Sequence, residues 1–314
     1  MRPPAGAGTS EIVDAPELSV VVLAWDNLEH TRAFVESVRR NTDVGYELII
    51  VDNGSGPEAA EFARSAADRS ILNTENRGFA PGMNQGLALA DGEFVAFCNN
   101  DTVLPPDWAS RLLETARAHP RAAIVVPAIT SASNPVTVRS EPGPDVEVLE
   151  PFGAPPAAVV YLMRRDLVLA LTGWDEDYEI ASGEDVDLGF KVWVNDLDIV
   201  YDQRVLVEHV GHATASKLEG SRQRWIRNRR HFLDKWIGPV DPPRLASCDP
   251  ARFDRNRATA RAAARWMEKY FTIRDRRVEQ ELSAAARAPR SGRQRLRAAS
   301  RSLRRRLRAL RSTP

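Results

Sequence analysis

The sequence predicts an α/β protein with a mostly parallel sheet and helices on both of its faces. Between Leu18 and about Val126, short runs rich in β-branched residues alternate with stretches of helical periodicity. Strands and helices in alternation are typical of parallel sheets, in which a helix connects one strand to the next. The chain has 314 residues, 43% of them hydrophobic, which is enough to bury one or two cores.

The first half of this pattern is regular. Leu18–Ala24 is almost entirely apolar and predicts a buried strand, and Glu29–Asn41 predicts a helix with Phe34, Val35 and Val38 on its inner face. Pro57 suits the first turn of the next helix, where a backbone N–H is not needed. The remaining elements of this half are expected as strands at Glu47–Val51, Ser70–Leu72 and Glu93–Phe97 and helices at Pro57–Ala67 and Pro81–Ala90.

The second half is less regular. A proline-rich connection, Pro142–Pro156, precedes a predicted strand at Ala158–Met163. The following elements are expected as a helix at Arg165–Leu171, a loop at Gly173–Gly183, a helix at Glu184–Val194 and short strands at Ile199–Val200 and Val205–Glu208. Beyond Gly220 we expect a helical C-terminal extension in pieces to about Ala285. The domain prediction is therefore a flexible N-terminus (1–17), a main domain (18–240), a helical extension (241–285) and a tail (286–314).

Composition argues against several classes of protein. The longest uninterrupted apolar run, Ala157–Met163, is far shorter than the ~18 residues of a spanning helix. The first ten residues lack the apolar core of a secretory signal, so a cytoplasmic location is expected. Cys98 and Cys248 lie far apart without histidine or cysteine at ligand spacing, which argues against a disulfide or a zinc site.

Charge is balanced overall but unevenly distributed. After Glu281 every charged residue is an arginine, 11 in all, whereas the rest of the chain holds 32 basic and 43 acidic residues. Leu296, Leu303, Leu307 and Leu310 share one face of a helix over this tail, which suits a peripheral position on an anionic membrane at its cytoplasmic face. A solvated tail that folds back on the acidic body is the alternative, and nucleic acid is the least favoured partner because that body would repel it.

Polar residues follow three of the predicted strands. They are Trp25-Asp26-Asn27, Asp52-Asn53-Gly54-Ser55 and Asn99-Asn100-Asp101-Thr102. Ligands of α/β sheets bind at the carboxyl ends of strands, although such residues also serve as turn formers and helix caps. The sequence alone leaves these two interpretations open.

Five segments in order make the pattern specific. Between about Leu18 and about Lys235 the chain contains SVVVLAWDN, ELIIVDNGS, NRGFAPGMNQGLALADGEFVAFCNNDT, GWDEDYEIASGEDVDLGFKVW and VLVEHVGHAT. Together they resemble glycosyltransferase family 2, the inverting enzymes with the GT-A fold, and within it the rhamnosyltransferase-like branch. The resemblance implies a nucleoside-diphosphate sugar as donor and a glycan or lipid-linked acceptor.

The resemblance assigns the donor side of the site. It implies that the Asp52 carboxylate accepts the N3–H of a pyrimidine base and that Trp25 flanks this base. A carboxylate suits uracil or thymine because both present an imide N–H. Donor contacts are further expected from Asn53, Arg77, Asn84, Asn99 and Asn100.

The metal motif of the family falls on Asn99-Asn100-Asp101 and departs from two aspartates, leaving Asp101 as the charged ligand. His209 matches a late histidine that supplies another ligand, whereas His212 has no such match. Mg²⁺ or Mn²⁺ is expected, because these cations accept few carboxylates when diphosphate and water complete the coordination.

The acidic signature Glu184-Asp185-Val186-Asp187 begins a predicted helix. Acidic residues there also complement the helix dipole. The resemblance implies that Asp185 is the general base, with Glu184 the competing candidate and Asp187 orienting its surroundings.

Other site motifs do not fit. Strand one is not followed by G-x-G-x-x-G, and no P-loop occurs. Asp175-x-Asp177-x-Glu179 imitates a calcium loop, but Ile180 stands where glycine is required. The function that the resemblance implies is transfer of a sugar from dTDP-rhamnose or a UDP-sugar to a cell-envelope acceptor. The alternative is a catalytically silent, membrane-docked module that binds nucleotide sugar.

Overall fold

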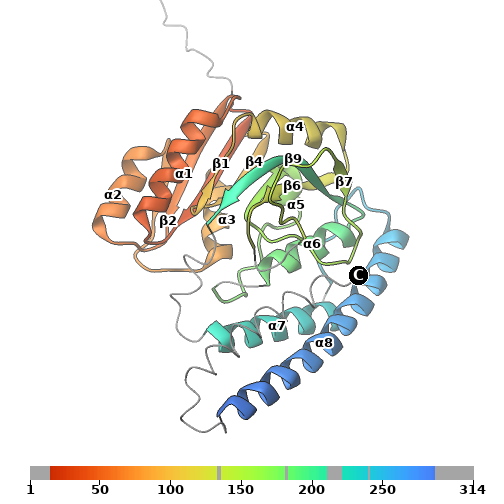
Figure 1. The fold of residues 1–314 in the computed structure, drawn as a ribbon. Helices are drawn as coiled ribbons and strands as arrows, with labels where there is room; N and C mark the ends of the chain where they lie inside the picture. Colours follow the sequence, from red (N-terminus) through yellow and green to blue (C-terminus); the bar gives the residue numbers. More distant parts are fainter. Residues whose placement is uncertain (1–14, 133–135, 181–182, 211–220, 240, 287–314) are drawn as a thin grey trace, which may run out of the picture.

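The computed structural model describes residues 15–132, 136–180, 183–210, 221–239 and 241–286. Within them the chain forms a mixed sheet that helices cover on both faces (Figure 1). The strands are β1 (Leu18–Ala24), β2 (Tyr46–Asp52), β3 (Arg69–Leu72), β4 (Phe94–Asn99), β5 (Thr102–Val103), β6 (Ala122–Ile129), β7 (Val146–Val148), β8 (Val160–Arg164) and β9 (Asp198–His209). The helices are α1 (Leu28–Asn41), α2 (Pro57–Ala66), α3 (Phe79–Leu89), α4 (Trp108–Ala118), α5 (Arg165–Ala170), α6 (Glu184–Val194), α7 (Ser221–Ile237) and α8 (Pro250–Ala286).

The first half of the sheet is parallel. Strand β1 pairs with both β2 and β4, and β2 pairs with β3, all in the same direction. Every strand and helix expected between Leu18 and Phe97 is present, with ends that differ by one or two residues. The α/β fold class is confirmed.

The second half adds antiparallel pairs. The order of strands is β3-β2-β1-β4-β8-β6-β9-β5, with β7 beside β9. Strand β8 runs antiparallel to β4 and β6, whereas β6 and β9 are parallel. The sheet is thus parallel in its first half and mixed as a whole, which the local sequence pattern did not specify.

Strand β9 is longer than the sequence predicts. It is continuous from Asp198 to His209, where two short strands were expected. The polar residues in its middle pack inward: Asp202 is fully buried and accepts hydrogen bonds from Arg204 and from Thr115 Oγ1 at 2.7 Å. They lie near a register shift between Pro127 and Ala128 of β6. The polar residues at this register shift interrupt the apolar pattern of the sequence, but the strand continues through them. Strand β7 lies in the proline-rich connection, where no strand was expected.

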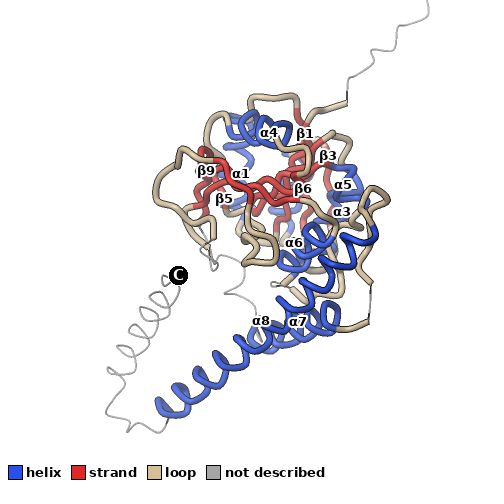
Figure 2. Tube along the Cα trace, turned by 90° about the vertical axis from the view of Figure 1, so that its right-hand side faces the viewer, coloured by secondary structure: helices blue, strands red, loops and turns tan. Residues whose placement is uncertain are grey.

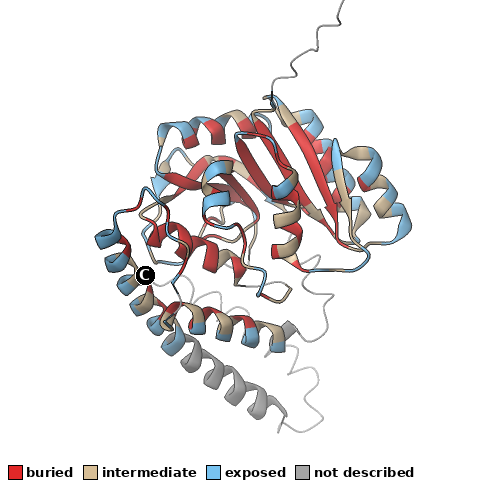
Figure 3. Cartoon of the chain, turned by 180° about the vertical axis from the view of Figure 1, so that it is seen from behind, coloured by how far each residue is buried: buried red, intermediate tan, exposed pale blue. Residues whose placement is uncertain are grey.

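Each face of the sheet has its own core (Figure 3). Helices α1, α2 and α4 pack on one face, through residues such as Phe34, Ala63 and Trp108. Helices α3, α5, α6, α7 and α8 contribute to the core of the other face. This second core extends to Phe253, Ala260 and Ala264 of α8, so the C-terminal helices are part of the packed body.

Helices α7 and α8 lie side by side, and α8 continues beyond α7 (Figures 1 and 2). Helical structure after Gly220 is therefore confirmed, as two helices. None of the described helices is long and apolar enough to cross a membrane. His212 and residues 287–314 of the arginine-rich tail lie outside the described residues, and the domain boundaries and the tail's role stay predictions.

Candidate active site

Three parallel strands bring the predicted donor residues to one edge of the sheet. In the register of the sheet, Ala24 of β1 lies opposite Asp52 of β2, and Leu23 lies opposite Asn99 of β4. Trp25, Asp52 and Asn99 therefore stand at neighbouring carboxyl ends. This is the edge at which ligands of α/β sheets bind.

The Asp52 carboxylate is buried and incompletely bonded. The residue is 1% exposed, and its Oδ2 accepts the backbone N–H of Ser55 at 3.2 Å. Its Oδ1 is buried and has no hydrogen-bond partner among the described residues. Because buried carboxylate oxygens are normally paired, this atom can accept a hydrogen bond that the described residues do not supply. Trp25, half-buried, directly follows the neighbouring strand.

Asn53 is bonded entirely within the protein. Its Nδ2 donates to Asn76 Oδ1 at 2.9 Å and to the Gly78 carbonyl at 3.1 Å. Its Oδ1 accepts from Asn73 Nδ2 and from the backbone N–H of Arg77, both at 3.1 Å. These contacts use both donors and both acceptor positions of the amide. The side chain thus fixes the segment that carries Arg77.

The backbone of this segment approaches Gly54 closely. Gly54 has φ +84°, and a Cβ placed on it would lie 2.6 Å from Glu75 Cα. Only glycine adopts this positive φ readily and leaves room for the Glu75 backbone. The Arg77 side chain is exposed at this edge, and none of the described residues forms an ion pair with it.

Asn84, predicted as a donor contact, is bonded to another loop. Its Nδ2 donates to the Trp174 carbonyl at 2.9 Å and to Glu176 Oε1 at 2.8 Å, and its Oδ1 accepts the Trp174 N–H at 2.9 Å. The amide therefore connects α3 to the segment that leads toward α6. Asn100 is likewise engaged, because its Nδ2 donates to Thr31 Oγ1 of α1 at 3.0 Å.

Asp101 and His209, which the sequence predicts as metal ligands, lie together. The short β5–β9 ladder aligns Thr102 with His209 and leaves Asp101 Oδ1 3.3 Å from His209 Nε2. The other ring nitrogen, Nδ1, lies 2.6 Å from the Ser131 carbonyl, which can only accept a proton. Nδ1 therefore carries the hydrogen, and Nε2 faces a carboxylate oxygen.

Two acceptors that face each other need a positive charge between them. Burial would lower the pKa of His209, but the Asp101 contact and the Ser131 carbonyl outweigh burial and raise it. Burial would raise the pKa of Asp101, but the hydrogen bond and charge of His209 outweigh burial and lower it. A proton shared by the two groups would satisfy the pair. A divalent cation fits the same donor set, because metal-binding imidazoles commonly donate their second N–H to a backbone carbonyl.

Asp185 stands at the start of α6, after Gly183 in a left-handed conformation with φ +100°. Its Oδ1 accepts the Val186 N–H at 2.8 Å. Burial raises the pKa of Asp185, although backbone N–H groups, including that of Ala158, act in the opposite direction. The carbonyl of Val159, the residue after Ala158, accepts the N–H of Asn99 at 2.9 Å. Asp185 is therefore tied to the end of β4, beside the residues predicted to bind the donor.

Glu184, the competing candidate, is 7% exposed, and Asp187 is fully buried. Asp187 Oδ1 accepts Trp236 Nε1 and its Oδ2 accepts Lys235 Nζ, each at 2.8 Å. Lys191 Nζ lies 3.6 Å from the same carboxylate. Asp187 therefore anchors α7 to α6, as a residue that orients its surroundings would.

Sequence analysis missed the partners of this anchor. Lys235 also donates to Asp175 Oδ2, and His231 Nε2 lies 3.2 Å from that atom. Asn228 of α7 bonds both the N–H and the carbonyl of Glu179, at 2.8 and 2.7 Å. No local pattern marks contacts between segments about 50 residues apart.

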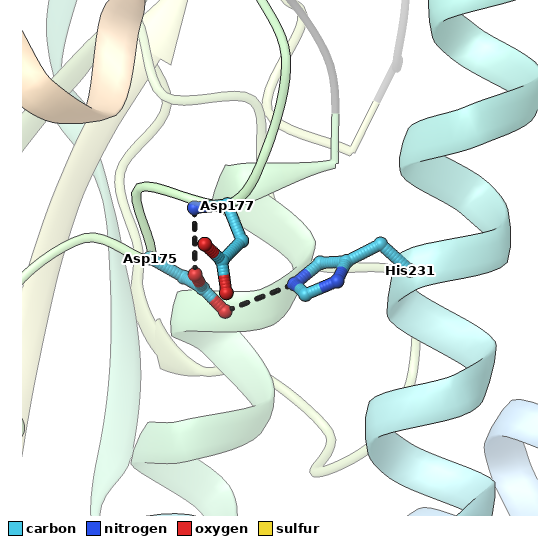
Figure 4. Close-up of side chains that lie close together, drawn as sticks. All are labelled: Asp175, Asp177 and His231. Atoms are coloured by element: carbon cyan, nitrogen blue, oxygen red, sulfur yellow. Dashed lines mark hydrogen bonds and ion pairs between the residues drawn. The ribbon is translucent and has the colours of Figure 1, made fainter.

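Asp175, Asp177 and His231 form a compact polar cluster (Figure 4). Their ligand atoms lie within 4.8 Å of one another, close enough to hold a metal ion. The Lys235 ammonium already bonds Asp175 there, so a metal ion would compete with it. Lys235 and the other neighbours outweigh burial and lower the pKa of Asp175 to about 2.

Known proteins share both the sequence pattern and the fold. The model of the family Glycosyl transferase family 2 matches residues 19–156. The putative glycosyltransferase EpsH of Bacillus subtilis is 32% identical over 108 residues, which are 33% of this chain and 31% of EpsH. The pre-mycofactocin glycosyltransferase of Mycobacterium tuberculosis is 29% identical over 224 residues, 66% of this chain and 44% of that protein. The chain thus spans less than half of either relative.

A solved structure of GalNAc-T7 with UDP, GalNAc and Mn²⁺ superposes with a TM-score of 0.54 and 13% identity. The match covers 79% of this chain and 55% of that one. At this identity the likeness concerns the fold, which is the GT-A fold. The family match over residues 19–156, the relatives and the order of the motifs together support a family 2 glycosyltransferase.

Proposed function

We propose that the chain is an inverting glycosyltransferase that uses a pyrimidine nucleoside-diphosphate sugar. The observation that carries the proposal is the buried Oδ1 of Asp52 at the end of β2, which has no hydrogen-bond partner in the described part of the chain. The N3–H of uracil or thymine is the donor that this atom lacks, and neither cytosine nor a purine offers the same donor in the same place. Trp25, on the adjacent strand end, would flank the base.

The donor diphosphate would meet Arg77 and a divalent cation. The Arg77 guanidinium is exposed at the same edge, and Asn53 fixes its backbone. Asp101 and His209 would hold Mg²⁺ or Mn²⁺, which stabilises negative charge on the departing diphosphate when bound. The Mn²⁺ and UDP in the GalNAc-T7 complex support this choice by analogy of fold.

Asp185 would act as the general base. Its ionised carboxylate takes the proton of the acceptor hydroxyl while that oxygen forms a bond to the anomeric carbon. Attack comes from the face opposite the diphosphate, which leaves with the electron pair of the broken bond, so the configuration inverts. The raised pKa of Asp185 makes it a stronger base than an ordinary carboxylate. Glu184 is the second candidate for this role.

For the substrates we propose dTDP-rhamnose or a UDP-sugar as donor and a hydroxyl of a cell-envelope glycan or glycolipid as acceptor. The Asn-x-Asp form of the metal motif favours rhamnose. An enzyme that acts on such an acceptor would be held peripherally at the inner face of the cell membrane.

Calorimetric titration with UDP, dTDP and GDP tests the proposal, each with Mn²⁺ and again with a chelator. We expect UDP or dTDP to bind more tightly than GDP, with Mn²⁺ strengthening the binding. Asp52→Asn should remove the preference over GDP while leaving the cation effect in place. Equal binding of the three nucleotides would refute the role of Asp52. Nucleotide binding without turnover of any tested donor sugar would favour the silent binding module.

A further inference from the structure

The α7–α8 layer has a charge opposite to that of the rest of the body. Residues 221–269 hold 13 basic and 5 acidic side chains, whereas residues 1–220 hold 16 basic and 35 acidic ones. This contrast does not involve the arginine-rich tail. The segment that contains the two helices therefore carries a net positive charge, whereas the part of the chain before it is acidic.

Helix α8 concentrates this character on its outward face. One stripe of the helix packs into the core through Phe253, Ala260 and Ala264. The opposite stripe, at spacings of three and four residues, contains Arg255, Ala258, Ala262, Trp266 and Lys269, all of them exposed. Trp266 is 65% exposed, the most of any large hydrophobic residue described. The acidic residues of this part of α8, Asp254 and Glu268, lie off the stripe.

A stripe of tryptophan, alanine and basic residues differs from an ordinary solvent face, where charges of both signs are mixed. We propose that this stripe binds the surface of an anionic lipid bilayer. Tryptophan favours the boundary between headgroups and acyl chains, the alanines allow close approach, and Arg255 and Lys269 would contact lipid phosphates. A second copy of the chain fits poorly, because a symmetric contact would place these cations against each other.

Docking through this stripe would bring the acceptor side of the site near the membrane. Helix α8 contacts both α6 and α7 (Figure 1). Helix α7 holds α6 through Asp187 and Lys235. The start of α6, with Asp185, thus belongs to the same packed layer. The inference rests on the peripheral membrane position in the proposed function and names the surface that would hold it. Its test needs no enzymatic activity, so its failure is distinguishable from a failure of the proposed reaction.

The test is co-sedimentation of the full chain with phosphatidylcholine vesicles, with and without phosphatidylglycerol. Arg265 is also exposed and lies beside the stripe, next to Trp266. The variant Arg255→Glu/Arg265→Glu/Lys269→Glu reverses the charge of all three cations, and Trp266→Ala removes the aromatic residue. The matched control Arg40→Glu/Arg64→Glu/Arg111→Glu makes the same change of net charge on α1, α2 and α4, which pack on the other face of the sheet. Circular dichroism and thermal unfolding confirm that each variant is folded.

We expect binding only to the anionic vesicles, weakened by salt. At about fivefold per cation near the headgroups, loss of three contacts should lower the partition coefficient about a hundredfold, and the control should change it far less. Trp266→Ala should also weaken binding. Equal losses in the reversed face and the control would overturn the proposal in favour of net charge or the tail. Equal binding to both kinds of vesicle, or a dimer that Trp266→Ala dissociates without lipid, would overturn it as well.

Discussion

Asn53→Asp exchanges one buried atom, the amide nitrogen, for an oxygen. In the parent protein that nitrogen donates to Asn76 Oδ1 at 2.9 Å and to the Gly78 carbonyl at 3.1 Å. A carboxylate has no proton to donate, so three oxygens would face one another at a position that is 1% exposed. The other side-chain oxygen would keep its bonds from Asn73 and Arg77.

The cost follows from these contacts. Two lost hydrogen bonds are each worth about 1 kcal/mol, and two acceptors left beside a buried charge add about 1–3 kcal/mol in all. We therefore expect a loss of about 3–5 kcal/mol in the free energy of unfolding at neutral pH. Protonation would restore one donor, so the folded state raises the pKa of the introduced carboxyl. Because the folded variant then binds more protons than the unfolded one, the loss should shrink as pH falls.

Urea unfolding followed by tryptophan fluorescence, at neutral and at mildly acidic pH, measures this loss. Asn53→Ala is the control, because it removes all four hydrogen bonds without adding a charge, and its penalty should not depend on pH. Unfolding of Asn53→Asp at the parent midpoint, or a penalty as large in acid as at neutral pH, would show that the amide does not hold the Arg77 segment.

Three further predictions concern single carboxylates. Asp185→Asn should lower turnover by roughly 10²- to 10⁴-fold while donor binding is kept. Burial raises the pKa of Asp185, so the activity of the parent protein should be lost on acidification at a higher pH than for an ordinary carboxyl group. Parent-like turnover in this variant would exclude the role. Asp101→Ala should weaken Mn²⁺-dependent nucleotide binding by about a hundredfold or more, since even indirect partners of a metal ligand contribute 10- to 100-fold; calorimetry that finds no cation effect in the parent would contradict the ligand assignment. Asp175→Asn should lower the free energy of unfolding by about 2 kcal/mol at neutral pH. This loss should disappear as pH falls from 3.8 toward about 2. A loss that does not depend on pH in denaturant titrations would count against the Lys235 contact.

Local patterns predict the first half of the fold well. Strands such as β1 and β2 are buried on both faces, so continuous apolar runs mark them. Helix α6 has the predicted bounds, Glu184–Val194, because an acidic first turn and a glycine before it mark its start. The strand ends likewise place Asp52 and Asn99 at one edge.

Contacts between distant segments account for what the sequence did not predict. The burial of Asp202 depends on Thr115, 87 residues earlier, so the middle of β9 looks like a turn when read alone. Asn53 and Asn84 were assigned to the donor because of their motifs, yet each side-chain amide is engaged with other parts of the protein. A sequence motif indicates that a position is important. Only the fold shows which atoms the side chain at that position contacts.

The anchor at Asp187 also sets an order of events during synthesis. Asp187 is buried against Lys235 and Trp236, which follow it by almost 50 residues. At about 5–20 residues per second, roughly 2–10 s separate their emergence from the ribosome. During that interval the strands up to β4 already have all their partners, because β8 precedes Asp187 in the chain. Burial of Asp187 without a counter-charge would be costly until Lys235 emerges. The strand ends that carry Asp52 and Asn99 can therefore form before the start of α6 is anchored, which must wait for α7.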